Sequence, residues 1–313
     1  MDLSQEIING NVTALSKGIT LIESAKEEHT KQAEKLLLRC LPHSGNSIRI
    51  AITGIPGVGK STFIETFGTI LTSIGKKIAV LAVDPTSERT HGSILGDKSR
   101  MHKLSGDKNA FIRPSPSSGA LGGVNNKTRD SIILCEAAGF EVIIIETVGV
   151  GQNETTVNNL TDFFLLLMLA GAGDELQGIK RGIIELADAL IITKSDGENI
   201  QQSQKASIEY KRAFQLFPPL ENGWIPEVST CSAIENIGIL EILEKIEKFD
   251  RKMIKNGWKV LNRKKQDKYW LHVYIRDELG KKQYNILKTN GKLKKLENQL
   301  KKGEPIHTLL KTL

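Results

Sequence analysis

The stretch Gly54-Ile-Pro-Gly-Val-Gly-Lys-Ser61 decides the fold of this 313-residue chain. It fits the pattern G-x-x-x-x-G-K-[ST], follows an apolar run at Ile48 to Ile52, and leads into a helix-compatible segment. Glycines let backbone N–H groups turn inward around a phosphate, a helix amino terminus favours negative charge, and Lys and Ser reach the phosphates and Mg²⁺. The motif predicts a phosphate-binding loop formed by Gly54, Ile55, Pro56, Gly57, Val58, Gly59, Lys60, Ser61 and Thr62.

The sequence around this loop alternates between short β-branched runs and helix-compatible stretches. The runs are IRIAIT, KIAVLAV, EVIIIET, FFLLLML and ALIIT. This alternation is typical of an α/β fold with a mainly parallel central sheet and crossover helices. We therefore predict a P-loop NTPase domain at 46–250, preceded by a helical extension at 1–45 and followed by a helical region at 251–313.

Composition limits the class of protein further. The amino terminus resembles neither a secretory signal nor a transit peptide, and no apolar run approaches the roughly 20 residues of a membrane-spanning helix. We therefore expect a soluble cytoplasmic protein with no membrane partner. Cys40, Cys135 and Cys231 are odd in number and far apart, which favours reduced thiols in a core over a disulfide framework.

The formal net charge of +7 is unevenly distributed. Residues 251–313 hold 18 Lys/Arg and 5 Asp/Glu, so this segment is +13 and the remainder is 7 − 13 = −6. A basic segment of this kind can bind nucleic acid or anionic surfaces. Its apolar residues nevertheless recur at roughly helical intervals, so we expect helices with a solvated basic face and regard nucleic-acid binding as unlikely.

Acidic residues follow two of the predicted strands and indicate a metal site. Asp84 ends the second strand, and Glu146 ends the strand that begins at Val142. Carboxyl ends of parallel strands are where ligands of open α/β sheets bind. Glu146 with Gly149 matches the layout of a Walker B acid joined to a γ-phosphate-sensing glycine, although Glu replaces the usual Asp.

The run Thr193-Lys-Ser-Asp196 resembles the N-K-x-D element that reads guanine. Asp196 can accept hydrogen bonds from guanine N1–H and N2–H₂, a pattern that adenine does not offer, and Lys194 can pack along the base. Thr193 stands in place of the usual Asn, which puts in question the bond that ties the loops together. Ser232, Ala233 and Ile234 resemble the element whose backbone supports the base.

Longer strings of the sequence resemble the MeaB/ArgK-type P-loop GTPases, the family associated with methylmalonyl-CoA mutase. The strings include GIPGVGKST, AVDPTSERTHGSILGDKSRM, AFIRPSPSSGALGGV, CEAAGFEVIIIETVGVGQNE, LTDFFLLLMLAGAGDELQGIKRGIIELAD and TCSAIENIGI. The resemblance implies a homodimeric GTPase that binds GTP, GDP and Mg²⁺ and dimerises through its carboxyl-terminal helices. It also implies a chaperone of an adenosylcobalamin-dependent acyl-CoA mutase, which gates cofactor loading and protects or reactivates the mutase; an older label for the family is amino-acid transport kinase.

Site residues carry over from the family by position. The resemblance implies a Mg²⁺ shell of Ser61, Asp84, Asp97 and Glu146, a switch at 150–154 after Gly149, and a second mobile loop at 171–180. Lys60 would stabilise the transferred charge, Gln152 and Gln177 are candidates for orienting the attacking water, and Gln177 and Lys180 could reach the phosphates once the partner docks.

Two other classes of function remain open from the sequence. A metal-insertion GTPase would favour a Cys/His cluster, whereas this chain has no C-x-C, no C-x-x-C and no His-rich tract. A P-loop kinase acting on a small molecule would need an acceptor pocket, for which no motif is visible. Neither alternative has a sequence feature of its own.

Overall fold

A computed structural model describes residues 2–24, 26–83, 101–114, 123–147, 154–171 and 181–313. Its contacts divide the chain into two compact units. The first contains residues 1–46, 118–139 and 259–313, and the second contains residues 47–117 and 140–258. The two units are described separately below.

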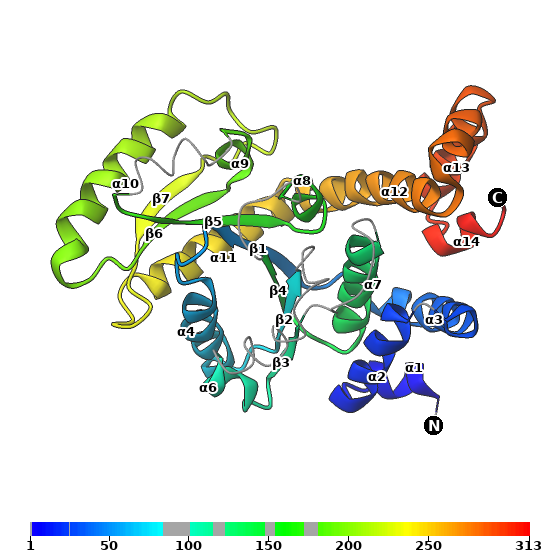
Figure 1. Ribbon diagram of the computed structural model, residues 1–313, viewed down its shortest axis with the longest axis horizontal. Helices are drawn as coiled ribbons and strands as arrows, with labels where there is room; N and C mark the ends of the chain where they lie inside the picture. The colour runs from blue at the N-terminus through cyan, green and yellow to red at the C-terminus, as the bar shows by residue number, and fades with distance from the viewer. Residues whose placement is uncertain (1, 25, 84–100, 115–122, 148–153, 172–180) are drawn as a thin grey trace. The chain divides into compact units, whose positions relative to one another are not determined.

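The second unit is built on one parallel sheet, whose described strands run in the order β3-β2-β4-β1-β5-β6-β7 (Figure 1). Every strand pair is parallel, and β1 lies between β4 and β5, with Ile50 opposite Ile144 on one side and Phe163 on the other. The strands are β1 (Ile48–Gly54), β2 (Ile78–Val83), β3 (Ala110–Arg113), β4 (Val142–Thr147), β5 (Phe163–Leu169), β6 (Ala189–Thr193) and β7 (Glu227–Thr230).

Helices cover both faces of this sheet, as right-handed crossovers require. Helices α4 and α11 pack against each other on one face, and α8, α9 and α10 lie on the other (Figure 1). The helices of the unit are α4 (Lys60–Ser73), α6 (His102–Ser105), α8 (Glu154–Asn158), α9 (Arg181–Leu186), α10 (Ile200–Phe214) and α11 (Ile239–Lys255). The predicted α/β P-loop fold is confirmed.

Two strands of the sheet were not expected from the sequence. Strands β3 and β7 each have only four residues, and only one residue in each is buried. They lie at the two edges of the sheet, where one side needs no partner strand. A short, half-buried edge strand lacks the continuous apolar run that identified β4 and β5.

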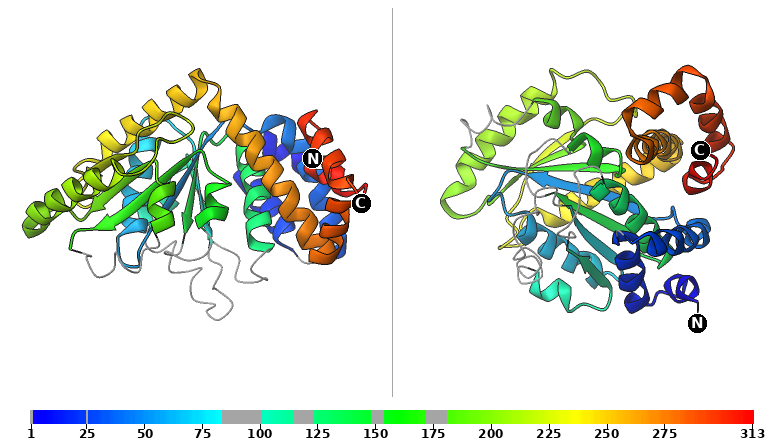
Figure 2. Two further views of the ribbon diagram at one scale, coloured as in Figure 1. Left: turned by 90° about the horizontal axis from the view of Figure 1, so that it is seen from above. Right: turned by 45° about the vertical axis from the view of Figure 1, so that its right-hand side comes forward.

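The first unit consists of helices from three separate parts of the chain. The amino-terminal helices, α7 and the carboxyl-terminal helices lie together in both views of Figure 2. Gly18 explains the close packing of α2: a Cβ there would lie 2.8 Å from Ile7 Cδ1 and 3.0 Å from Leu134 Cδ1. The helices are α1 (Leu3–Ile8), α2 (Val12–Glu23), α3 (Glu27–Cys40), α7 (Gly123–Ala137), α12 (Trp258–Thr289), α13 (Lys292–Lys301) and α14 (Ile306–Leu310).

Glycines shape the carboxyl-terminal helices. Helix α12 is interrupted at Gly280, whose φ of 74° and ψ of 166° are not helical. The turn expected at Asn290-Gly291 is present, because Gly291 adopts a φ of 79° between α12 and α13. Beyond Gly280, the Tyr284 hydroxyl lies 2.9 Å from Nδ1 of His272. Glu297 Oε1 lies 2.9 Å from Nε2 of the same ring. The predicted Lys-rich amphipathic helices therefore fold back on one another.

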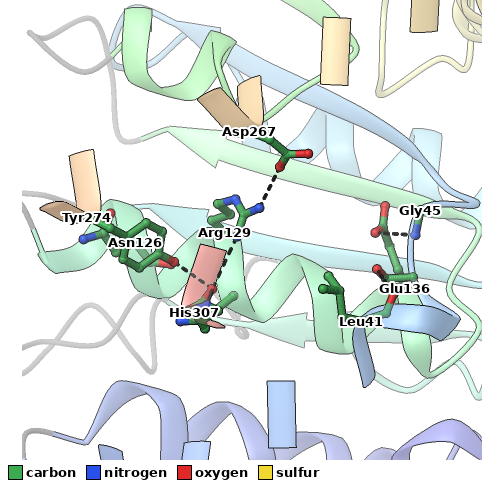
Figure 3. Close-up of polar contacts among 10 residues, drawn as sticks. Leu41, Gly45, Asn126, Arg129, Glu136, Asp267, Tyr274 and His307 are labelled. Carbon is green, nitrogen blue, oxygen red and sulfur yellow. Dashed lines mark hydrogen bonds and ion pairs between the residues drawn. The ribbon is translucent and has the colours of Figure 1, made fainter. Parts of the chain in front are cut away.

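Helix α7 carries a polar cluster that links it to other helices of the first unit (Figure 3). Tyr274 donates to Asp130 at 2.7 Å, and His307 lies 3.0 Å from the same carboxylate oxygen. Arg129 donates to Asp267 at 2.7 Å. Burial alone would lower the pKa of Arg129. The charges of Tyr274, Asp267 and Asp130 outweigh the effect of burial, so the pKa of Arg129 is raised. The cluster joins α7, α12 and α14 through partners that compensate one another, as buried charges require.

The division of the chain into domains at 1–45, 46–250 and 251–313 remains a prediction. The contact units differ from it, because both terminal segments and residues 118–139 belong to one unit. All three cysteines are free and buried, as expected. Among the described residues, no helix has the length and apolar character needed to cross a membrane.

Asp188 is a buried carboxyl group at the amino-terminal edge of the sheet. It is 8% exposed, and its Oδ2 accepts a hydrogen bond from the Phe164 N–H at 2.9 Å. Burial raises the pKa of Asp188 to about 7; the Phe164 bond opposes this rise and the charge of Asp162 adds to it. The group is therefore protonated in the folded chain at a pH where an unfolded chain has lost the proton.

We expect Asp188→Asn to reduce the pH dependence of stability. An unfolded Asp has a pKa of about 3.9, so between pH 4 and 7 the folded state binds more protons and stability falls as pH rises. Between pH 5 and 8 the wild-type chain should lose about 2–3 kcal/mol more unfolding free energy than the variant. Urea denaturation at both pH values measures the difference, and parallel pH dependence of the two proteins would contradict it.

Candidate functional site

The predicted phosphate loop follows the central strand directly. β1 ends at Gly54 and α4 begins at Lys60. A Cβ at Gly54 would lie 2.5 Å from the Leu167 carbonyl oxygen, so the loop leaves the sheet where no side chain fits. Gly57 and Gly59 have φ values of 78° and 93°, in the left-handed region that glycine adopts most readily. The sequence supplies glycine at the positions where the turn requires it.

Lys60 is turned back onto this loop. Its Nζ donates to the carbonyl oxygens of Gly54 at 2.9 Å and Ile55 at 3.2 Å. Burial lowers the pKa of Lys60, and the negative charge of Glu146 opposes that change. The ammonium group is therefore held at the loop by neutral carbonyls, which an anionic phosphate oxygen can replace with a stronger charge-assisted bond.

Ser61 and Glu146 meet beside the loop. Ser61 Oγ donates to Glu146 Oε1 at 3.1 Å, and Glu146 is 7% exposed. On the same strand as Glu146, the buried Thr147 hydroxyl donates to the Thr53 hydroxyl at 2.8 Å and joins the ends of β4 and β1. A hydroxyl and a carboxylate are oxygen donors of the type Mg²⁺ prefers, so this pair fits the predicted metal shell.

Thr193 stands where the N-K-x-D element has Asn, and it makes a bond that ties this segment to the phosphate loop. Its hydroxyl lies 2.7 Å from the Val58 carbonyl oxygen and 3.2 Å from that of Met168. Since Val58 belongs to the phosphate loop and Met168 to β5, this one side chain spans three parts of the site. A short hydroxyl side chain therefore connects the T-K-S-D segment to the phosphate loop, at the position where the N-K-x-D element has the longer Asn.

Lys194 and Asp196 lie next to this contact. Lys194 adopts a φ of 54°, and a Cβ at Gly59 would lie 3.9 Å from Lys194 Cε, so its side chain runs beside the phosphate loop. Asp196 Oδ2 accepts the Ser232 hydroxyl at 2.5 Å. A carboxylate offers about four acceptor sites, so this bond fixes Asp196 while leaving it able to accept from a base.

The loop containing Ser232, Ala233 and Ile234 is closed by its own backbone. Ser232 and Ile237 exchange both backbone hydrogen bonds at 3.0 Å. Gly238, with a φ of 78°, ends the loop where a Cβ would lie 2.5 Å from the Thr230 carbonyl oxygen. Ile234 is 79% exposed, and Thr66 of α4 donates to the Ala233 carbonyl at 2.9 Å.

The structure therefore brings the P-loop, Glu146, Lys194, Asp196 and the Ser232 loop to one edge of the sheet. Thr66, Thr193 and Gly238 also shape the site, but the sequence motifs include Thr193 only as a departure and do not indicate a role for the other two. Thr66 and Thr193 act through backbone carbonyls far away in the sequence, whereas Gly238 is required by its close approach to the nearby Thr230 carbonyl. Six predicted site residues lie outside the described residues: Asp84, Asp97, Gly149, Gln152, Gln177 and Lys180.

The part of the chain that the structure describes contains no group of three or more His, Cys, Asp or Glu side chains placed to hold a metal ion. The predicted Mg²⁺ shell differs from such a group, because it includes the Ser61 hydroxyl and two aspartates, Asp84 and Asp97, from the undescribed segments. Its only described carboxylate is Glu146.

Comparison with known protein families places this site in context. The family described as methylmalonyl-CoA mutase-associated GTPase MeaB matches residues 15–287, which include every described element of the site. The chain belongs to the MeaB family of GTPases. The resemblance noted in the sequence is thereby confirmed, and the matched residues include the whole parallel sheet together with α3, α7 and most of α2 and α12.

Individual relatives of this MeaB-family GTPase are similar over most of its length. GTPase ArgK of Escherichia coli is 45% identical over 86% of the chain and 82% of its own length. The mouse protein named methylmalonic aciduria type A homolog, mitochondrial, is 44% identical over 87% of the chain and 68% of its own length. A crystal structure titled LAO/AO transport system kinase superimposes with a TM-score of 0.77 at 35% identity, covering 95% of this chain and 88% of that one.

We expect Thr193→Val to weaken GDP binding about fivefold to tenfold, because it leaves the Val58 carbonyl without the hydroxyl that fixes it. Valine keeps the shape of the side chain, whereas Thr193→Ser keeps the donor. The serine variant should therefore stay near wild-type affinity. Titration with a fluorescent GDP analogue measures both, and equal affinity of the valine variant and the wild type would show that the contact does not support the site.

Proposed function

We propose that this MeaB-family GTPase is a chaperone of an adenosylcobalamin-dependent acyl-CoA mutase of the methylmalonyl-CoA mutase type, acting in the cytoplasm. In this role it hydrolyses GTP, gates loading of the mutase cofactor, and protects or reactivates the mutase. The observation that carries the nucleotide part of the proposal is the bond from Thr193 to the Val58 carbonyl, which joins the guanine-reading segment to the phosphate loop. Family membership supports the choice of partner.

The phosphates of GTP or GDP fit the loop between β1 and α4. Its glycine conformations allow backbone N–H groups to face inward, and α4 starts at Lys60, so the positive end of the helix dipole points to the same place. Ser61 and Glu146 would hold Mg²⁺ together with Asp84 and Asp97. When bound, Mg²⁺ neutralises charge on the β- and γ-phosphates.

The guanine base fits between the T-K-S-D segment and the loop after β7. Asp196, fixed by Ser232, would accept from N1–H and N2–H₂, and the aliphatic stem of Lys194 would cover one face of the base. The backbone of Ser232, Ala233 and Ile234 would support its edge. Because adenine lacks that pair of donors, recognition by Asp196 would favour guanine nucleotides.

Hydrolysis would proceed by in-line attack of water on the γ-phosphoryl group. Lys60 would stabilise the charge that develops on the transferred group, and Gly149 would sense the γ-phosphate. Gln152 and Gln177 are our candidates for orienting the water, and Lys180 for reaching the phosphates in the complex. Catalysis would be mainly electrostatic, and such a site turns over slowly until a partner completes it.

The carboxyl-terminal helices would join two copies of the chain. Val260 and Leu261 of α12 are 62% and 48% exposed, although both are large apolar side chains. Exposed apolar residues that are adjacent on one helix are typical of interfaces between subunits. We therefore propose a homodimer that uses this part of α12.

We expect GTP turnover to test both parts of the function. The purified protein alone should hydrolyse GTP slowly, in a Mg²⁺-dependent manner, and should hydrolyse ATP much less. A cobalamin-dependent methylmalonyl-CoA mutase from the same organism should accelerate the reaction. Lys60→Ala should lower turnover by about 100-fold or more, because it removes a charge that stabilises the transition state.

The outcomes distinguish the proposed nucleotide site from the proposed mutase partner. Turnover that needs Lys60 but does not respond to the mutase would retain the nucleotide site and reject the partner. Turnover that is equal with ATP would reject guanine recognition by Asp196. Lys76→Ala is a suitable control, since Lys76 forms an ion pair with Glu141 on the surface and should leave the rate unchanged.

We expect Val260→Asp combined with Leu261→Asp to convert the protein to a monomer. Two carboxylates at these positions would have to be buried in an interface without partners, which is strongly unfavourable. Light scattering after gel filtration should give twice the 34.5 kDa of one chain for the wild type and one chain mass for the variant. A wild-type mass of one chain would contradict the proposed homodimer.

A further inference from the structure

Thr66 makes a hydrogen bond that is unusual for its place in a helix. It lies in α4, six residues after Lys60, and its hydroxyl donates to the Ala233 carbonyl oxygen at 2.9 Å. Threonine hydroxyls inside helices commonly bond to the carbonyl four residues earlier. Thr69 does so in the same helix, donating to Glu65 at 2.7 Å. Thr66 instead connects α4 to a loop 167 residues further along the chain.

Past Ser232, which is buried and bonded to Asp196, the loop that Thr66 contacts is largely exposed. It is short, with Ser232 and Ile237 bonded to each other and Asn236 at a φ of 58° between them. Ile234 is largely exposed rather than packed in the core. A loop with few buried apolar contacts has a low local stability, so single polar bonds have a large influence on its position.

Helix α4 is a rigid support for this loop. Phe63, Ile64 and Phe67 are fully buried in the unit, and the rings of Phe63 and Phe67 stack 5.5 Å apart. The same helix begins with Lys60 and Ser61 at the phosphate loop. A bond from Thr66 to Ala233 therefore fixes the base-supporting loop relative to the helix that holds the phosphate-binding side chains.

We propose that Thr66 is a positioning residue for guanine recognition, which holds the Ser232–Ala233–Ile234 loop at the correct distance from the phosphate loop. This inference rests on the proposed guanine site. Thr66 acts through the Ala233 backbone and does not itself touch the nucleotide. Its loss should therefore affect binding of the base and leave binding of the phosphates unchanged.

The test compares four variants of the full-length protein: Thr66→Val, Thr66→Ser, Thr69→Val and Asp196→Ala. Thr69→Val is the matched control. Thr69 is half-buried like Thr66 and lies in the same helix, but its hydroxyl bonds only within that helix. For each protein, the dissociation constants for GDP and ADP are measured by calorimetry with Mg²⁺, and the melting temperature is recorded. Thr66→Ala replaces Thr66→Val if the latter is not recovered folded.

We expect Thr66→Val to weaken GDP binding about fivefold to tenfold while the ADP constant stays the same, so that discrimination falls by that factor. Thr66→Ser should keep the discrimination of the wild type, and so should Thr69→Val. A purely structural role would lower the melting temperature of Thr66→Val without changing discrimination, and would overturn the inference.

Two further outcomes distinguish this inference from the proposed site. If Asp196→Ala abolishes discrimination but Thr66→Val leaves it intact, the guanine site holds and the role of Thr66 is wrong. If Asp196→Ala also leaves discrimination intact, the guanine site itself is wrongly assigned, and the inference about Thr66 is rejected with it.

Discussion

The parallel pairing of β1 with β4 and β5 is the constraint on which the nucleotide site depends. It places Ile52 opposite Glu146 and Gly54 opposite Leu167, so the strands end together at one edge of the sheet. Parallel strands have their amide and carbonyl groups satisfied by neighbours, but the segments that leave their carboxyl ends must find other partners. Lys60 and Thr193 supply several of those partners.

Hydroxyl groups provide much of the connection between the loops at this edge. Thr147 joins β4 to β1, Thr193 joins β6 to the phosphate loop, and Thr66 joins α4 to the loop after β7. Each bond is individually modest, contributing about 0.5–1.5 kcal/mol net. A threonine side chain is short and stiff at χ1, so little conformational entropy is lost when it bonds. These bonds therefore favour one arrangement of loops that would otherwise move independently.

In the first unit, charged groups are buried between helices that come from three parts of the chain. Glu136 of α7 accepts the Gly45 N–H at 2.8 Å (Figure 3). Glu136 also lies 3.6 Å from Arg263, whose guanidinium donates to the Gly45 carbonyl at 2.6 Å. Asp130 is similarly surrounded by Tyr274, His307 and Arg129. Removing one partner of such a group leaves a buried charge uncompensated, which is more costly than the bond itself is favourable. The polar clusters thereby restrict how these helices can pack.

The sequence by itself determined the fold class, the P-loop, and the positions of Glu146 at the end of a central strand and of Asp196 just after β6. These features depend on local order along the chain: an apolar run, then glycines or an acid, then a helix. Only the tertiary structure decided that Thr193 reaches Val58, that Thr66 holds Ala233, and that α7 belongs with the terminal helices. Those contacts join residues 100 or more positions apart in several cases, and a short polar side chain gives no sign in sequence of which distant carbonyl it will meet. The short edge strands β3 and β7 were likewise decided by the neighbours they pair with, since four half-buried residues have too weak a pattern to predict a strand.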